Sequence, residues 1–293
     1  MSKKKSKKSK KSKKTSATPF SDALRVGQGF VLDDVDTRDT PAFDGDKKDG
    51  QEALRAADDE MDDLQEQLYA HGTSGGTEKI LLLIQGLDTA GKGGIMRHVV
   101  GAVDPQGTQI TAFKAPTKEE LEHPFLWRIR KALPGAGMIG VFDRSHYEDV
   151  LIVRVEELVP KATWSRRYST INDFEQELVA DDTTLIKVML HISKDEQEER
   201  LAERLDNPEK YWKYNPGDID TRERWDDYME AYQAIMDKTS TDAAPWHVVP
   251  ADRKWYARLA VQQLLLEHLR ALDLQWPEAD FDIDAEKARL AAS

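Results

Sequence analysis

The sequence predicts an α/β protein in which helices cover both faces of a parallel β-sheet. Two observations lead to this prediction. Short apolar runs alternate with helix-compatible stretches over most of the 293 residues. One of these runs, residues 80–84, is entirely apolar, as expected for a strand that is buried on both faces. The length suits one such domain with additional segments.

The expected strands are short, and the segments between them have helical periodicity. Ligands of such sheets bind beyond the carboxyl ends of the strands, so functional residues are expected at that edge. The expected strands are residues 79–85, 109–113, 138–143, 184–192 and 247–249, and the expected helices are residues 51–69, 94–103, 118–132, 148–158, 165–180, 195–205, 221–239 and 254–272.

Composition divides the chain into four parts. Residues 1–20 are expected to be a disordered, lysine-rich arm, because residues 1–14 contain nine lysines and no acid, although the whole chain has a net charge of −12. Residues 21–77 form an extension with one helix and a glycine-rich connector, residues 78–272 the main domain, and residues 273–293 a C-terminal tail. The arm can bind a polyanion such as nucleic acid or polyphosphate, or it can be a solubilising tail.

Several protein classes do not fit this composition. Cysteine is absent, which excludes a disulfide framework and a thiolate metal site. No apolar run has the length of a membrane span, and no secretory signal is visible. We therefore expect a cytoplasmic protein without a membrane partner. The histidines lack metal-ligand spacing, and His98, His123, His146, His191 and His247 are interpreted as structural.

The most informative motif is residues 86–94, Gly-Leu-Asp-Thr-Ala-Gly-Lys-Gly-Gly, between an expected strand and an expected helix. Gly86, Gly91 and Lys92 fit the spacing of a phosphate-binding loop, whose backbone N–H groups face an anion at a helix N-terminus. An ordinary glycine-rich turn is the alternative. The expected phosphate-binding residues are Gly86, Thr89, Ala90, Gly91, Lys92, Gly93 and Gly94.

Two positions of this loop indicate chemistry that depends on a metal. Gly93 stands where a Ser or Thr usually binds Mg²⁺, so a hydroxyl ligand is missing. Asp88 places a carboxylate inside an anion-binding loop, where it would repel phosphate unless a cation lay between them. The expected strand 138–143 also ends in a carboxylate, Asp143, and is followed by Arg144, which can bind a phosphate.

Residues 194–225 are interpreted as a mobile lid over the strand ends. This segment combines basic side chains with two Asn-Pro breaks, as expected for a lid that excludes water and brings cations to phosphates. The alternative is a solvated helix whose arginines pair with neighbouring glutamates. The basic residues expected to bind phosphate from the lid are Arg200, Arg204, Lys210 and Lys213.

Taken together, these motifs resemble the polyphosphate kinase type 2 family. The resemblance rests on residues 86–94, 113–116, 142–149, 206–213, 224–228, 244–252 and 254–259, in order, and covers about residues 50–272. It implies a three-layer P-loop kinase fold with a parallel sheet and a helical lid, and a homo-oligomer. It also implies that Asp88 and Asp143 direct Mg²⁺, or Mn²⁺ in its place, and that Lys92 and Arg144 contact the reacting phosphates.

The resemblance also implies the reaction. We expect Mg²⁺-dependent phosphoryl transfer between inorganic polyphosphate and a purine nucleotide, forming ADP or ATP from AMP or ADP. With Glu148 at this position, the sequence resembles the family members that accept nucleoside monophosphates as well as diphosphates. The alternative role of Glu148 is to cap a helix. Two other functions stay open: an ATP-dependent small-molecule kinase of the same fold, and a non-catalytic protein that binds nucleotides or polyanions.

Overall fold

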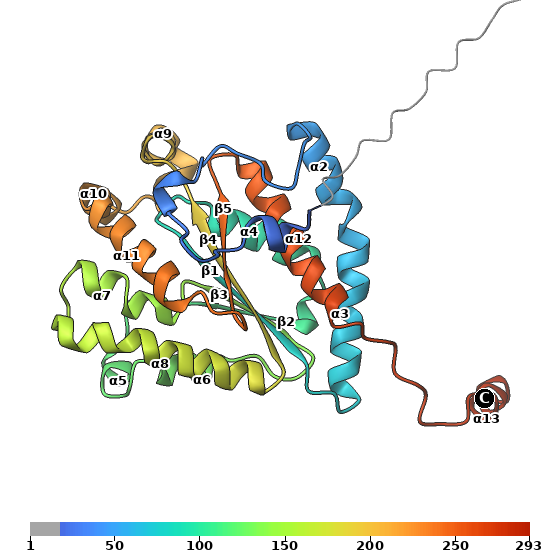
Figure 1. Ribbon diagram of the computed structural model, residues 1–293. Helices are drawn as coiled ribbons and strands as arrows, with labels where there is room; N and C mark the ends of the chain where they lie inside the picture. The colour runs from blue at the N-terminus through green and yellow to red at the C-terminus, as the bar shows by residue number, and fades with distance from the viewer. Residues whose placement is uncertain (1–17) are drawn as a thin grey trace, which may run out of the picture.

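In the computed structural model, which describes residues 18–293, five parallel strands form one sheet in the order β2-β3-β1-β4-β5 (Figure 1). The central strand contains residues 80–84, which are fully buried, as a strand covered on both faces requires. The predicted α/β fold with a parallel sheet is confirmed. The strands are β1 (Lys79–Gln85), β2 (Thr108–Ala112), β3 (Ile139–Asp143), β4 (Thr183–His191) and β5 (Trp246–Pro250).

Long helices cover the two faces of this sheet, which makes three layers (Figure 1). On one face, α12 (Lys254–Ala271) packs against β4 and β5 and against α2 (Lys47–Ala56), α3 (Asp58–Thr73) and α4 (Lys92–His98). On the other face, α8 (Lys161–Ala180) packs against β4 and against α11 (Trp225–Thr239).

Several expected helices are shorter than predicted or are divided. The expected helix 118–132 is two helices separated by Pro124, which lacks an N–H for a continuous helix. The expected helix 221–239 is likewise two helices, α10 and α11. The remaining elements are α5 (Lys118–Leu121), α6 (Trp127–Lys131), α7 (Ile152–Val155), α9 (Lys194–Asp206), α10 (Gly217–Glu223), and the 3-10 helices η1 (Leu32–Asp34), η2 (Val100–Ala102), η3 (Pro105–Gly107), η4 (His146–Asp149) and η5 (Pro208–Lys213).

The N-terminal segments differ from the prediction in two respects. Most of the expected arm lies outside the described residues, but Phe20 is buried and begins α1 (Phe20–Ala23), so order starts before residue 21. The single helix expected over residues 51–69 is two helices, α2 and α3, that meet at Ala57. Helix α2 packs closely against α12 at Gly50. A Cβ on this residue would lie 2.4 Å from the Trp255 ring of α12.

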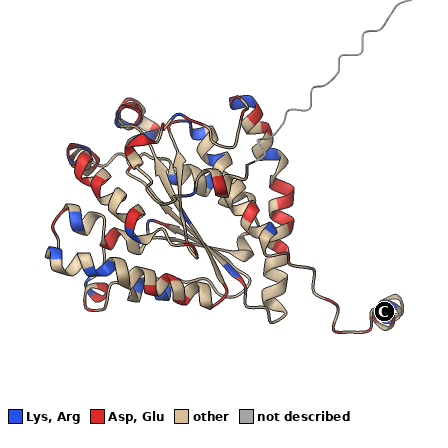
Figure 2. Cartoon of the chain, in the orientation of Figure 1, with Lys and Arg blue, Asp and Glu red and all other residues tan. Residues whose placement is uncertain are grey.

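The C-terminal tail leaves the body after α12 and contains α13 (Ile283–Ala291), which lies apart from the rest of the molecule (Figure 1). Acidic residues lie along α3 (Figure 2). Within residues 18–293, no helix has the length and apolar character needed to cross a bilayer.

Candidate active site

The phosphate-binding loop joins β1 to α4 through an unusual backbone. Gly86 has a φ of 150°, and a Cβ at this position would lie 2.8 Å from the carbonyl oxygen of Leu190 on β4. Thr89 has a φ of 68°, which is strained for a β-branched residue. Gly91 has a φ of 117° and immediately precedes α4. The loop therefore holds a conformation that depends on its glycines and on support from neighbouring residues.

Lys92 lies folded over this loop. Its Nζ donates hydrogen bonds to the carbonyl oxygens of Gly86, at 2.7 Å, and Leu87, at 3.2 Å. Burial lowers the pKa of Lys92, and the nearby carboxylate of Asp88 opposes that shift. The ammonium group is therefore held at the start of the helix, where it can move to a bound phosphate.

Two carboxylates meet at the ends of neighbouring strands. Asp88 follows β1, Asp143 ends β3, and residue Ile84 of β1 pairs with Asp143 in the sheet. Nη2 of Arg144 donates to Oδ1 of Asp88 at 2.7 Å. Burial alone would raise the pKa of Asp88, but Lys92 and Arg144 lower it below the usual range. Asp88 is therefore ionised at neutral pH.

These carboxylates suit a divalent cation that also binds substrate. Among residues 18–293, no group of three or more His, Cys, Asp or Glu side chains is placed to enclose a metal ion. Mg²⁺ at phosphate sites commonly takes only one or two carboxylates and completes its shell with water and phosphate oxygens. The backbone of Asp143 is hydrogen-bonded in the sheet, but its carboxylate makes no hydrogen bond or ion pair within the part of the chain that the structure describes, so it is available as a ligand.

Glu148 lies in η4, close to the same arginine. Its side chain is 14 % exposed, and its Oε2 lies 4.0 Å from Nη1 of Arg144. The amide of Gln85 is oriented so that its oxygen accepts from Ser145 and its nitrogen donates to Oε1 of Glu148 at 2.9 Å. Burial raises the pKa of Glu148, and Arg144 opposes the shift. A helix-capping side chain accepts a hydrogen bond from a backbone N–H. Within the described residues the Glu148 carboxylate accepts none.

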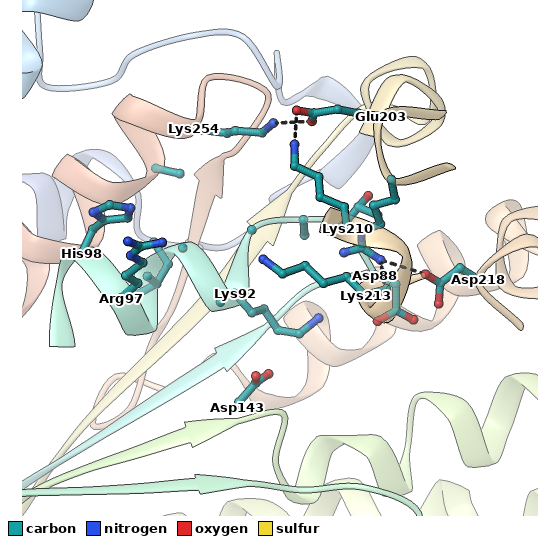
Figure 3. A pocket seen from close by; sticks show the side chains of 18 of the residues that line it. Asp88, Lys92, Arg97, His98, Asp143, Glu203, Lys210, Lys213, Asp218 and Lys254 are labelled. Carbon is teal, nitrogen blue, oxygen red and sulfur yellow. Dashed lines mark hydrogen bonds and ion pairs between the residues drawn. The ribbon is translucent and has the colours of Figure 1, made fainter. Parts of the chain in front are cut away.

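A large cavity of about 730 Å³ opens over the phosphate loop, between α4, α12 and the predicted lid (Figure 3). Basic side chains predominate in its lining, in contrast to the acidic outer surface of α3. Such a cavity concentrates favourable charge for an extended polyanion. The basic residues that line it are Lys92, Arg97, His98, Arg144, Arg204, Lys210, Lys213, Lys254 and Arg258.

Sequence reasoning found only part of this lining. Arg97 and Arg258 were not identified, and His98 was interpreted as structural although it faces the cavity (Figure 3). The four-residue spacing of Lys254 and Arg258 is a signal that could have placed both on one face of a helix. For Arg97 and His98, which end α4, no comparable sequence signal exists.

The predicted lid consists of α9, η5 and α10, and side chains within it hold these elements together. Nη1 of Arg204 donates to the carbonyl oxygen of Lys213 at 2.9 Å and to Oδ2 of Asp218 at 3.0 Å. Lys210 pairs with Glu203 (Figure 3). The other guanidinium nitrogens of Arg204 have no partner within the described residues, so they can still bind phosphate.

Arg200 does not have the predicted position. It is 5 % exposed and lies under the loop, outside the residues that line the large cavity. Its Nε–H donates to Glu196, and its remaining four N–H groups donate to the carbonyl oxygens of Thr89, Ala90, Ala251 and Asp252 at 2.6–3.0 Å. A guanidinium has five N–H donors, so none remains for phosphate. The prediction that Arg200 binds phosphate is wrong, because helix α9 turns this side chain inward.

A buried polar network anchors η4 from behind. Nζ of Lys187, on β4, donates to Glu175 at 2.6 Å, to the carbonyl oxygen of Thr239 at 2.6 Å and to the hydroxyl of Tyr147 at 3.1 Å. His146 lies 3.2 Å from the same glutamate. Since Tyr147 and His146 directly precede Glu148, the network fixes the turn that carries it.

Comparison with known proteins identifies the family. Residues 44–277 match the model described as polyphosphate kinase 2. The chain belongs to this family. Relatives in the family include an AMP/ADP-polyphosphate phosphotransferase of Meiothermus ruber, 45% identical over 251 residues, which are 86% of this chain and 92% of that protein. Another is an ADP-polyphosphate phosphotransferase of Rhodopseudomonas palustris, 43% identical over 269 residues, which are 87% of this chain and 91% of that protein.

A solved structure agrees with this assignment. The crystal structure of polyphosphate kinase 2 from Arthrobacter aurescens TC1 superposes with a TM-score of 0.93 and 58% sequence identity. The match covers 94% of this chain and 98% of that one. The P-loop kinase fold that the sequence predicted is therefore confirmed, while the roles of individual site residues stay predictions.

Proposed function

We propose that this protein transfers phosphoryl groups between inorganic polyphosphate and AMP or ADP, with Mg²⁺ as cofactor. The family and the activities for which its relatives are named support transfer between polyphosphate and nucleotides. The observation that carries the proposal is the Asp88–Arg144 pair, because both residues line two different cavities. One cavity is the large basic one, and the other is a small cavity beside Glu148.

This arrangement suits the geometry of phosphoryl transfer. The attacking and leaving oxygens lie roughly in line on opposite sides of the transferred phosphorus. The large cavity has the size and charge for a polyphosphate chain, whereas the small one, about 40 Å³, holds no more than a small polar group. We therefore assign the donor to the large cavity and the reacting end of the acceptor to the small one.

The proposed roles of the residues follow from their places. Asp88 and Asp143 would hold Mg²⁺, which neutralises phosphate charge when bound. Lys92 and Arg144 stabilise the negative charge that spreads over the transferred group. A phosphate oxygen of the acceptor is ionised at neutral pH and attacks without deprotonation. The protein therefore needs no general base, and its work is alignment and charge stabilisation.

Acceptance of AMP as well as ADP rests on Glu148. This side chain is buried next to Arg144, on the acceptor side of the Asp88–Arg144 pair. A carboxylate held there by Arg144 and Gln85 can orient water or a hydrated cation toward the shorter acceptor. The relative from Meiothermus ruber, which is named an AMP/ADP-polyphosphate phosphotransferase, supports this proposal.

The decisive experiment is a donor and acceptor matrix. The protein is incubated with AMP or ADP, with polyphosphate or ATP, and with Mg²⁺ or EDTA, and the nucleotides are separated by chromatography. We expect ADP and ATP to form only with polyphosphate and Mg²⁺, and Lys92→Ala to be the inactive control. Turnover with ATP as donor and none with polyphosphate would instead indicate a small-molecule kinase. Nucleotide binding without any turnover would indicate a non-catalytic protein.

A further inference from the structure

Tyr232, on α11, carries a buried hydroxyl that the fold does not satisfy. The residue is 1 % exposed, and its hydroxyl has no hydrogen-bond partner in residues 18–293. Tyr228, one turn earlier, differs because its hydroxyl donates to Glu156 at 3.3 Å. A buried hydroxyl without a partner destabilises a protein. Because Tyr232 lines a cavity, a group that enters this cavity and reaches the hydroxyl would supply the missing partner.

The cavity beside Tyr232 is small, and both charged and apolar side chains line it. It has a volume of about 40 Å³, and Asp88, Arg144 and Glu148 form one side of its wall. Arg144 lies between the two carboxylates and contacts both, at 2.7 and 4.0 Å, which offsets their charge. Leu151 and Ile152 line the cavity next to them, and its volume is too small for a nucleoside.

The hydroxyl is suited to donate a hydrogen bond. Burial raises the pKa of Tyr232 well above its usual value, and the Glu148 carboxylate raises it further. The phenol is therefore neutral throughout the physiological range and offers one O–H. Its complement is an oxygen atom with a lone pair, and an anionic oxygen gives the stronger bond.

We infer that this cavity is an oxygen-binding subsite for the acceptor, in which the Tyr232 hydroxyl donates to an oxygen of the acceptor's terminal phosphate. The inference rests on the proposed function, because the cavity lies on the acceptor side of the Asp88–Arg144 pair. It adds an acceptor-binding residue from α11, an element outside the phosphate loop and the lid.

The test is Tyr232→Phe, which removes only the hydroxyl. Calorimetric titration measures the Kd of AMP and of tripolyphosphate, each with Mg²⁺, and thermal unfolding of the free protein gives Tm. We expect the Kd of AMP to rise about tenfold, the loss typical of a hydrogen bond to a charged group. The Kd of tripolyphosphate should stay within about twofold, and Tm should be unchanged or higher because an unsatisfied group is gone. Tyr168→Phe, on α8, is the matched control and should leave both affinities unchanged.

Three results would overturn the inference. An unchanged Kd for AMP would mean that the hydroxyl holds only water or nothing. Weaker binding of tripolyphosphate in place of AMP would assign the subsite to the donor. A clear fall in Tm would mean that the hydroxyl is already satisfied in the free protein. These measurements do not need turnover, so the subsite and the proposed function can fail separately. If the protein is inactive with polyphosphate but Tyr232→Phe selectively loses AMP affinity, the proposed function is refuted and the subsite is supported.

Discussion

Nη2 of Arg144 lies 2.7 Å from Oδ1 of Asp88, so the arginine that follows β3 is paired with the carboxylate inside the phosphate loop. Arg144 has a φ of 64°, an uncommon conformation for a residue other than glycine. This backbone turns its side chain back across the strand ends, where it reaches both Asp88 and Glu148. One strained residue thereby connects the proposed metal ligands to the proposed acceptor side.

The two proposed metal ligands should respond differently to neutral substitution. Asp143→Asn and Asp88→Asn should each reduce turnover by about 10²-fold or more, because each removes a carboxylate from the cation. Only Asp88→Asn should also lower Tm, since it leaves the half-buried Arg144 without its closest partner. Turnover as a function of Mg²⁺ concentration and thermal unfolding test the pair. Near-normal turnover of either variant at saturating Mg²⁺ would contradict the assignment.

Arg200 should behave as a positioning residue for the loop. Arg200→Lys replaces five N–H donors in a planar fork with three on a flexible chain, so several carbonyl groups lose their partners. We expect a loss of about 2–4 kcal/mol in the free energy of unfolding, measured by urea denaturation, because the strained Thr89 loses its support.

Arg204→Lys is the matched control for this substitution. Arg204 lines the large cavity and makes two hydrogen bonds within the lid, so its variant should lose less stability than Arg200→Lys and should raise the KM for polyphosphate. The opposite pattern, a stable Arg200→Lys protein with a raised KM for polyphosphate, would restore Arg200 as a phosphate-binding residue.

Glu148→Asn should separate the two acceptors. We expect AMP phosphorylation to fall at least tenfold more than ADP phosphorylation, because the carboxylate acts on the shorter acceptor. Glu156→Gln, a charge change on the more exposed side of the same region, should affect neither selectively. Chromatography of the products with each acceptor measures the ratio. Equal losses for AMP and ADP would leave Glu148 with a general structural role only.

Acid should destabilise the protein through two buried histidines. Burial lowers the pKa of His191 and of His247 to about 4, below the value of 6.5 in an unfolded chain. Between pH 6.5 and 4 the unfolded state therefore binds more protons than the folded state, and stability falls as the pH falls. Each histidine contributes at most about 1.4 kcal/mol per pH unit in this window.

Urea denaturation at a series of pH values measures this slope. His191→Gln and His247→Gln should each flatten the profile between pH 6.5 and 4, whereas a substitution of the exposed His123 should not. A profile that keeps its slope in both buried variants would assign acid sensitivity to other groups.

The sequence by itself determined the features that neighbouring residues encode. The apolar run 80–84, the glycine spacing of residues 86–94 and the carboxylate at the end of the run 138–143 predicted β1, the phosphate loop and the meeting of Asp88 with Asp143 at one edge of the sheet. Such patterns are local, and a parallel sheet brings its strand ends together without further information. The family followed from the same motifs.

Only the tertiary structure decided which way the side chains on the surrounding helices point. Arg200 and Arg204 have the same chemistry and lie one helical turn apart, yet one supports the loop and the other faces the cavity. Arg97 and Tyr232 reach the two cavities from helices whose sequences give no sign of it. The rotation of a helix about its axis is set by how its apolar face packs against the sheet, and that packing involves residues distant in the chain.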